Sequence, residues 1–320
     1  VFTEPRMFNL MFKTFMGPVE DSSATIYIRP ETAQGSYVNF LNVQGTARQR
    51  VPFGIAQIGK AFRNEITPGN FIFRTREFEQ AEMQFFVKPG EDEAWFDQWM
   101  EIRMQWHKDL GIDDAKLRFH EHGPDELAHY AKKAFDIEYE FPFGWKEFEG
   151  IHNRTDFDLA RHQEYSGKRL EYIDAPTNER FLPYVVETAM GVDRTALVLL
   201  VDAYREEDID GDQRVVLGLH PKVAPTKVAV FPLVKKDGMP EIAQKLQADL
   251  RSAAIPSFYD QSGAIGRRYR RQDEVGTPWC VTIDGETAEQ NSVTIRDRDS
   301  LEQVRVATDK VVAWVRERLL

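Results

Sequence analysis

One segment of the sequence places guanidinium groups, an aromatic ring and a carboxylate at every second position. In a β-strand, residues of the same parity point to one face of the sheet. The even-numbered positions within residues 73–86 include such a set, namely Arg74, Arg76, Phe78, Gln80 and Glu82. Arginine can bind a phosphate through two parallel N–H groups, and a phenylalanine ring can stack on a base. This face therefore suits a nucleotide.

A purely structural interpretation of this face is also open. Solvated strand faces are often charged, and opposite charges across a hairpin stabilise each other by about 0.2 to 1 kcal/mol per pair. On the expected partner strand, Arg63 and Glu65 share a face in the same way. The sequence contains neither a GxxxxGK[ST] loop nor a GxGxxG after a strand, so side chains must hold any nucleotide.

Several motifs, in order along the chain, resemble the glycyl-tRNA synthetases of the dimeric, class II type. They are RPETAQG (29–35), QIGKAFRNEI (57–66), FRTREFEQAEMQFF (73–86), GIHNRTDFDL (150–159) and YVVETAMGVDR (184–194). Two later segments, EVGTPWCVTID (274–284) and VTIRDRDSLEQ (293–303), resemble that family's anticodon-binding domain. The resemblance implies an α+β protein: an antiparallel catalytic sheet flanked by helices, which activates glycine with ATP, followed by a small α/β domain that reads tRNA(Gly).

The resemblance also implies an ATP site. Arg63 corresponds to the arginine that holds the α-phosphate and the amino-acid carboxylate, and Arg194 to the one at the γ-phosphate; these two are the expected catalytic residues. Glu65 corresponds to the acid near the adenine amino group, Arg74 to a phosphate contact and Phe78 to the ring under adenine.

Two members of this site have a simpler alternative. Arg194 starts a predicted helix and could pair with its neighbour Asp193. Glu147 resembles an acid near the triphosphate that could hold Mg²⁺, a cation that prefers oxygen ligands and bound phosphate. Glu147 could equally be a solvated surface acid.

The glycine site implied by the resemblance is anionic and small. Glu82 and Glu187 correspond to the acids that bind the ammonium group, and Arg154 to an arginine at the substrate end. Glu31 and Gln34 correspond to polar residues of the same site. Selectivity should come from exclusion, because every competing amino acid is larger than glycine.

Two positions depart from the family's pattern. After Glu187 the family usually has Pro and Ser, and the serine hydroxyl helps to bind glycine, whereas this chain has Thr188 and Ala189. A hydroxyl group is lost there, or Thr188 replaces it imperfectly. In the expected hairpin loop, Gly69 stands where many relatives carry Arg, which puts one contact to the acceptor end of tRNA in doubt.

The elements that must position these residues follow from their periodicity. Strands are predicted over residues 24–28, 51–62 and 76–87, with loop 66–70 joining the last two into an antiparallel hairpin. Apolar spacing predicts helices over residues 91–110 and 125–135.

A second domain is predicted after the Pro-bearing link in residues 222–234, which gives a catalytic domain over 1–224 and an anticodon-binding domain over 225–320. The same link leads into a buried strand. Further along, we predict a helix over 240–255, strands over 278–284 and 292–296, and a closing helix over 300–320. Such alternation indicates a small α/β sheet between helices.

The segment IGRRYRR (265–271) is a candidate tRNA contact. Its arginines, Arg267, Arg268, Arg270 and Arg271, surround Tyr269. A basic stripe with an aromatic residue suits an RNA backbone and a stacked base. The alternative is a solvated charged loop.

Composition limits the other classes of protein. A formal net charge of −11 over 320 residues argues against coating nucleic acid by bulk attraction. The longest apolar run, around residues 197–201, is far too short to cross a bilayer, so we expect no membrane association. The single cysteine, Cys280, cannot form an internal disulfide, which favours a reducing, cytoplasmic setting. His120, His122 and His129 have no cysteines nearby, so no zinc site is predicted.

Three expectations remain. The sequence begins with Val1 in an apolar-rich segment, so we expect the native N-terminus to lie upstream. The resemblance implies a homodimer. The alternative to an enzyme is a non-catalytic relative that serves as a binding or regulatory subunit, and the retained charges of Arg63, Glu82, Glu187 and Arg194 favour the enzyme.

Overall fold

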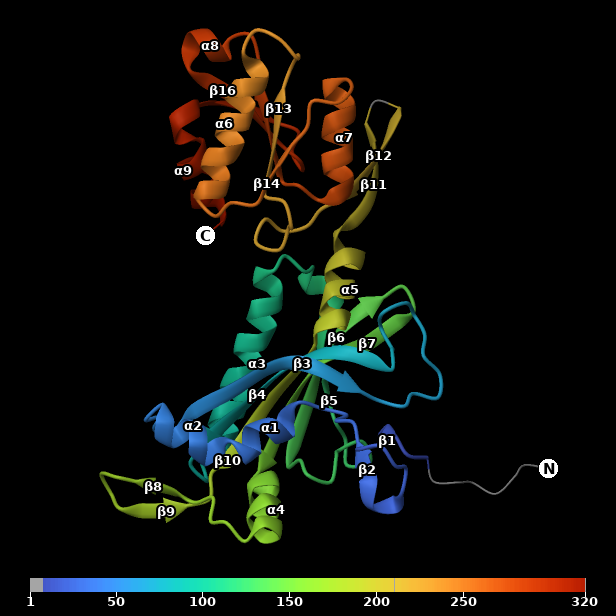
Figure 1. The fold of residues 1–320 in the computed structure, drawn as a ribbon, viewed down its shortest axis with the longest axis vertical. Helices are drawn as coiled ribbons and strands as arrows, with labels where there is room; N and C mark the ends of the chain where they lie inside the picture. Colours follow the sequence, from blue (N-terminus) through green and yellow to red (C-terminus); the bar gives the residue numbers. More distant parts are fainter. Residues whose placement is uncertain (1–7, 210, 320) are drawn as a thin grey trace, which may run out of the picture. The chain divides into compact units, whose positions relative to one another are not determined.

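The structure, a computed structural model, describes residues 8–209 and 211–319. These residues form two units, unit 1 within Val1–Lys108 and Asp113–Val198, and unit 2 within Asp109–Ile112 and Leu199–Leu320 (Figure 1). The boundary predicted near residue 225 falls inside unit 2, and its use as a domain limit stays a prediction. No helix in the described ranges has the length and apolar character needed to cross a membrane.

A six-stranded antiparallel sheet forms the centre of unit 1, in the order β3-β4-β10-β7-β6-β5. Its strands are β3 (Phe53–Phe62), β4 (Glu77–Val87), β5 (Leu117–Glu121), β6 (Lys133–Phe141), β7 (Gly144–Thr155) and β10 (Tyr184–Gly191). The predicted antiparallel hairpin is present, and its last pair joins Phe62 to Glu77. The connection between these strands therefore spans residues 63–76, more than the predicted loop.

Helices and small hairpins surround this sheet. The helices are α1 (Ala33–Val38), α2 (Phe40–Thr46), α3 (Asp92–Asp109), α4 (Phe157–Ser166) and α5 (Val192–Ala203), with 3-10 turns η1 (Ser22–Ala24) and η2 (Asp114–Lys116). The hairpins are β1 (Lys13–Phe15) with β2 (Thr25–Tyr27), and β8 (Tyr172–Asp174) with β9 (Glu179–Phe181). Buried Phe40, Phe53 and Phe86 pack together, and Tyr37 and Leu159 join the same core. This core ties α1, α2 and α4 to the sheet.

One predicted helix of unit 1 is confirmed and one is wrong. The helix predicted over 91–110 is α3, whereas residues 125–135 contain a turn and the start of β6. Gly123 O accepts from the amides of Glu126 and Leu127, and the amide of Lys132 then donates to Asn153 O of β7. Pairing with β7 satisfies the backbone groups of this segment, and this tertiary pairing outweighs its local helical spacing.

A five-stranded mixed sheet forms the centre of unit 2, in the order β14-β13-β15-β16-β17. Its strands are β13 (Val228–Pro232), β14 (Ser257–Tyr259), β15 (Trp279–Ile283), β16 (Ser292–Asp297) and β17 (Gln303–Ala307). The helices are α6 (Met239–Ser252), α7 (Ile265–Val275), α8 (Thr287–Gln290) and α9 (Val311–Leu319), with the 3-10 turn η3 (Thr308–Lys310). The hairpin of β11 (Tyr204–Ile209) and β12 (Asp212–Leu217) also belongs to this unit.

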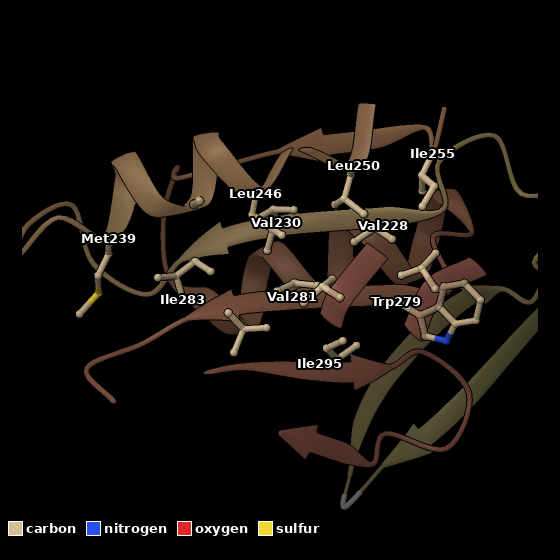
Figure 2. Packing of buried hydrophobic residues seen from close by; sticks show 14 residues of the cluster. Val228, Val230, Met239, Leu246, Leu250, Ile255, Trp279, Val281, Ile283 and Ile295 are labelled. Atoms are coloured by element: carbon tan, nitrogen blue, oxygen red, sulfur yellow. The ribbon is translucent and has the colours of Figure 1, made fainter. Parts of the chain in front are cut away.

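Both faces of the second sheet are covered, as predicted for an α/β sheet between helices. Val228 and Val230 of β13 pack with Leu246 and Leu250 of α6 (Figure 2). Their neighbours of opposite parity, Ala229 and Phe231, pack on the other face with Ile265 and Tyr269 of α7. A strand covered on both faces has no polar alternation, which explains the continuous apolar run that marks β13 in the sequence.

The closing helix predicted over residues 300–320 is wrong in its first part. Residues Gln303–Ala307 form β17, and the helix α9 covers only Val311–Leu319. Val304 and Val306 alternate with Gln303 and Arg305, so the period is that of a strand. β17 pairs with β16 and completes the sheet.

Candidate active site

A cavity of about 290 Å³ lies on the central sheet of unit 1. Its wall is built from the 63–76 connection, β4, β6, β7, β10 and the start of α5. Most of the predicted site residues line it: Glu31, Arg63, Glu65, Arg74, Phe78, Glu82, Glu147, Glu187, Ala189 and Arg194. The predicted arginines and the predicted carboxylates therefore surround one space.

Arg63 and Arg74 come from the connection between β3 and β4. Arg63 Nε donates to Pro30 O at 3.1 Å, and its guanidinium lies 5.4 Å from the centre of the Phe78 ring. Within residues 8–209 and 211–319, neither arginine forms an ion pair with a carboxylate. Their positive charge is therefore left for an anionic ligand in the cavity.

Arg76, which the alternation placed on the same face, does not line the cavity. The strand β4 begins only at Glu77, so strict alternation does not extend back to residue 76. Arg76 Nε instead donates to Glu65 O at 3.1 Å, which holds the two ends of the connection together.

Arg194, in the first turn of α5, is held by the 63–76 connection and by β7. Its Nε donates to Phe73 O at 3.0 Å, its Nη1 donates to Glu147 O at 3.0 Å, and the guanidinium lies 4.4 Å from the Phe73 ring. The alternative pairing with Asp193 does not form, because Asp193 accepts the amide of Glu79 at 2.7 Å. The charged partner of Arg194 is Glu147, at 3.4 Å from Nη1 to Oε2.

Glu187 is the central carboxylate of the anionic end. Its strand, β10, lies between β4 and β7, so Gln84 and His152 stand directly opposite it on either side. Gln84 Nε2 donates to Oε2 at 2.6 Å, and Nη1 of Arg154 lies 3.1 and 3.3 Å from the two oxygens. His152 Nδ1 lies 3.2 Å from Oε1, an ion-pair distance without hydrogen-bond alignment.

These partners keep Glu187 ionised although it is buried. Burial alone would raise the pKa of Glu187, but the charge of Arg154 and the contacts with His152 and Gln84 lower it to about 2. The pKa of His152 responds in the opposite direction: burial lowers it, and the Glu187 carboxylate outweighs burial and raises it.

Glu82 is the second buried carboxylate, with 5% of its surface exposed. The amide of Thr32 donates to its Oε2 at 2.8 Å, and the Thr32 hydroxyl donates to the same oxygen. Burial, and then the negative charge of Glu187, raise the pKa of Glu82 to about 7, and the Thr32 bonds only partly oppose this. An arriving cation would relieve the repulsion between the two acids.

Known proteins match both units of the chain. Residues 14–203 match the tRNA synthetase class II core domain (G, H, P, S and T), and residues 227–318 match the anticodon binding domain. The chain is 56% identical over 323 residues to the glycine–tRNA ligase of Treponema denticola, covering 99% of this chain and 71% of that protein. It is 57% identical over 318 residues to that of Caldanaerobacter subterraneus subsp. tengcongensis, covering 99% and 68%. The chain belongs to the glycine–tRNA ligases. The predicted α+β fold, a class II core followed by an anticodon-binding domain, is confirmed.

Two residues assigned to the glycine site of this family do not line the cavity. Arg154 is buried behind Glu187, and its Nε and Nη2 donate to Asp158 at 2.7 and 2.9 Å. Gln34 lies on α1, and its Nε2 donates to Glu31 at 2.8 Å. Each acts on the cavity through a carboxylate that does line it.

The departure at residues 188 and 189 lies on β10. Glu187 and Ala189 share the face that lines the cavity, whereas Thr188 has the opposite parity and does not line it. The Thr188 hydroxyl is therefore on the wrong face to replace the serine of the family's pattern.

Sequence reasoning assigned no role to several residues of the cavity wall, among them Gln80, His122, Tyr130, Asp136 and His152. Gln80 was on the predicted face, and its buried Oε1 has no hydrogen-bond partner among the described residues. His122 Nε2 lies 2.8 Å from Asp136 Oδ2. His122 follows β5 and Asp136 lies on β6. The pairing of these strands was not predicted from the sequence, so no local pattern could have shown that the two side chains meet.

The predicted tRNA contact in residues 265–271 is a helix, α7, and not a loop. Arg268 is 2% exposed and donates to Pro232 O at 2.6 Å and Leu233 O at 3.1 Å, which corrects its prediction as an RNA contact. The hydroxyl of Tyr269 is 2.6 Å from that of Thr282, so this ring belongs to the interior. Arg267 and Arg271 are exposed and Arg270 is half-buried, and Arg271 pairs with Asp260.

No group of three or more metal-ligating side chains occurs in the part of the chain that the structure describes. Glu147 offers a carboxylate to a cation beside Arg194, and its side chain is 48% exposed. One carboxylate fits a Mg²⁺ ion that takes its other ligands from water and phosphate.

Proposed function

We propose that this chain ligates glycine to tRNA(Gly) in two steps, through a glycyl-adenylate formed from ATP. The observation that carries the proposal is the cavity itself, with Arg63, Arg74 and Arg194 around one part of its wall and the buried acids Glu82 and Glu187 around another. The relatives named above carry the same activity in their names.

In the first step, the glycine carboxylate attacks the α-phosphorus of ATP in line, and pyrophosphate leaves. The protein supplies position and positive charge rather than a covalent nucleophile. Arg63 binds the α-phosphate and the glycine carboxylate, Arg74 and Arg194 bind the remaining phosphates, and Glu65 and Phe78 hold the adenine. In the second step, a ribose hydroxyl at the 3′ end of the tRNA attacks the activated carbonyl, and AMP leaves.

Glu82 and Glu187 bind the ammonium group of glycine, with Glu31 beside them. The ammonium offsets the repulsion that raises the pKa of Glu82, so binding favours a cation at this place. Ala189 presents only a methyl group to the cavity, and Arg154 and Gln34 support the acids from behind.

Mg²⁺, when bound, neutralises phosphate charge, and Glu147 is the residue that would hold it. Arg267, Arg270 and Arg271 on α7 remain proposed contacts to the tRNA; their support is their charge and the exposure of Arg267 and Arg271.

A homodimer is proposed on the basis of exposed apolar side chains. Ile26 and Tyr27 of β2, Val38 of α1, Leu41 of α2 and Ile58 of β3 are all more than a third exposed. The strand β3 is an edge of the sheet, and exposed apolar groups at an edge favour association. Light scattering should report twice the mass of the chain.

A cytoplasmic location is proposed from the single cysteine. Cys280 is buried, and burial raises the pKa of its thiol well above the usual range, which suppresses its reactivity.

Glycine-dependent exchange of pyrophosphate into ATP tests the function directly. Wild-type protein should exchange with glycine and not with alanine or serine. The variant E187A should lose exchange by at least about a hundredfold, because it removes a charged contact to the ammonium, while its circular dichroism stays native. A folded wild-type protein without exchange would favour the non-catalytic alternative, and normal exchange in E187A would remove Glu187 from the glycine site.

A further inference from the structure

One face of α4 carries two polar residues, each of which is connected to an acid of the cavity wall through one intermediate side chain. Asp158 and His162 are four residues apart, so they lie above each other on the same side of the helix. Neither residue lines the cavity. Asp158 is buried, with 5% of its surface exposed, and His162 is half-buried.

The first connection runs from Asp158 to Glu187 through Arg154. Asp158 accepts from Nε and Nη2 of Arg154, and this bidentate contact fixes the plane of the guanidinium. The Tyr130 ring lies 3.9 Å from the guanidinium carbon and restricts it further. The remaining nitrogen, Nη1, then spans both oxygens of Glu187. Asp158 therefore determines where the charge of Arg154 meets the ammonium-binding acid.

The second connection runs from His162 to Glu31 through Gln34. Gln34 uses its amide nitrogen to donate to Glu31 at 2.8 Å, which leaves its Oε1 as an acceptor. His162 Nε2 lies 2.8 Å from that oxygen and must therefore be the donor. His162 thus selects the amide orientation in which Gln34 donates to Glu31.

The two connections also meet. The Tyr37 ring lies 6.0 Å from that of His162, and the Tyr37 hydroxyl donates to Gln84 Oε1 at 2.5 Å. Gln84 in turn donates to Glu187 at 2.6 Å. The connection to Glu187 therefore continues through Gln84 to Tyr37, whose ring packs beside His162 of the connection to Glu31.

We infer that α4 is the positioning element of the glycine site, with Asp158 acting through Arg154 on Glu187 and His162 acting through Gln34 on Glu31. This inference rests on the proposed function. The inference predicts different effects on glycine binding and on ATP binding, because none of these contacts reaches the arginines that are proposed to bind ATP. Loss of either α4 residue raises the KM for glycine and leaves the KM for ATP unchanged.

Steady-state pyrophosphate exchange on the full chain tests this with four variants. D158N removes the bidentate contact, H162L removes the donor to Gln34, H162Q restores an N–H at a similar place, and E164Q is a matched control. Glu164 is an exposed acid of the same helix that pairs with Arg161. Thermal unfolding of each variant separates misfolding from misplacement.

The KM for glycine should rise about ten- to a hundredfold in D158N, because a charge-assisted contact is lost. It should rise about two- to fivefold in H162L, whose hydrogen bond is solvent-exposed, and return toward wild type in H162Q. E164Q should match wild type. If D158N does not unfold cooperatively, it is misfolded, and the glycine KM of H162L compared with that of H162Q then tests the inference alone.

An unchanged glycine KM in D158N and H162L, beside an active wild type and E164Q, would overturn the inference. So would an equal rise in both KM values, which a general structural role predicts. Absence of exchange in the wild type would instead overturn the proposed function, and the inference with it.

Discussion

Unit 1 and unit 2 each gather arginines and acids, but they use them differently. In unit 2, Asp273 is fully buried and accepts from Arg214 at 3.0 Å and from Arg296 at 2.9 and 3.1 Å. In unit 1, Arg63 and Arg74 face a cavity and have no carboxylate partner among the described residues. Arginines saturated by acids hold a fold together, whereas arginines left without an acid beside a cavity are ready for a ligand.

The acids show the same contrast. Asp273 lies between two guanidinium groups, while Glu82 lies near another acid, Glu187, and is held by the neutral Thr32. A buried acid whose neighbour has the same charge is costly unless a cation arrives. The comparison therefore distinguishes charges that are paired within the fold in unit 2 from charges in unit 1 that we propose bind the substrates.

The largest effect should come from breaking the saturated cluster. D273A leaves Arg214 and Arg296 buried without a shared partner, and should lower the free energy of unfolding by about 3–5 kcal/mol. Urea denaturation measures this loss. At temperatures where the variant stays folded, pyrophosphate exchange should be unchanged; a stability equal to wild type would contradict the structural role.

The next largest effect should come from an arginine of unit 1 that has no carboxylate partner among the described residues. R63A should slow adenylate formation by about a hundred- to a thousandfold, because it removes positive charge from the reacting phosphate. Single-turnover formation of glycyl-adenylate is the measurement. R318A, a change at an exposed arginine on α9 of unit 2, is the control and should react like wild type.

A pH dependence should follow from Glu82. Its pKa is raised to about 7, so the carboxylate needed for the ammonium is protonated below pH 7. Glycine KM should therefore rise about tenfold per unit as the pH falls below 7, and level off above it. The same measurement on E82Q should lose this dependence; a slope that persists would assign the titration to another group.

The smallest effect should come from Thr32, the neutral residue that donates hydrogen bonds to Glu82. T32V removes the Thr32 hydroxyl, whose hydrogen bond to Glu82 lowers the pKa of that acid. The midpoint of the glycine KM profile should therefore move to higher pH by about one unit, since a hydrogen bond to a charged group contributes about 1.5 kcal/mol or more. T25V, a change at a half-buried threonine of β2 that does not line the cavity, serves as the matched control.

Much of this site was predictable from residue types and motifs. Arg63, Glu82, Glu187 and Arg194 were identified from the sequence, and the structure places all four on one cavity. Arg268 was misjudged because a basic stripe does not reveal which of its members face the interior of a helix-covered sheet. The predicted helix over residues 125–135 failed for a related reason, since its partner strand lies about twenty residues further along the chain.

The sequence alone determined the family, the types of the reacting groups and the strands β2, β3, β4, β13, β15 and β16, because motifs and two-residue alternation are local properties. Only the tertiary structure decided which charges are paired. It placed β10 between β4 and β7, so that Gln84 and His152 flank Glu187, and it brought Arg154 of β7 against Glu187. The pairing of charges depends on which distant segments become neighbours, and no local pattern carries that information.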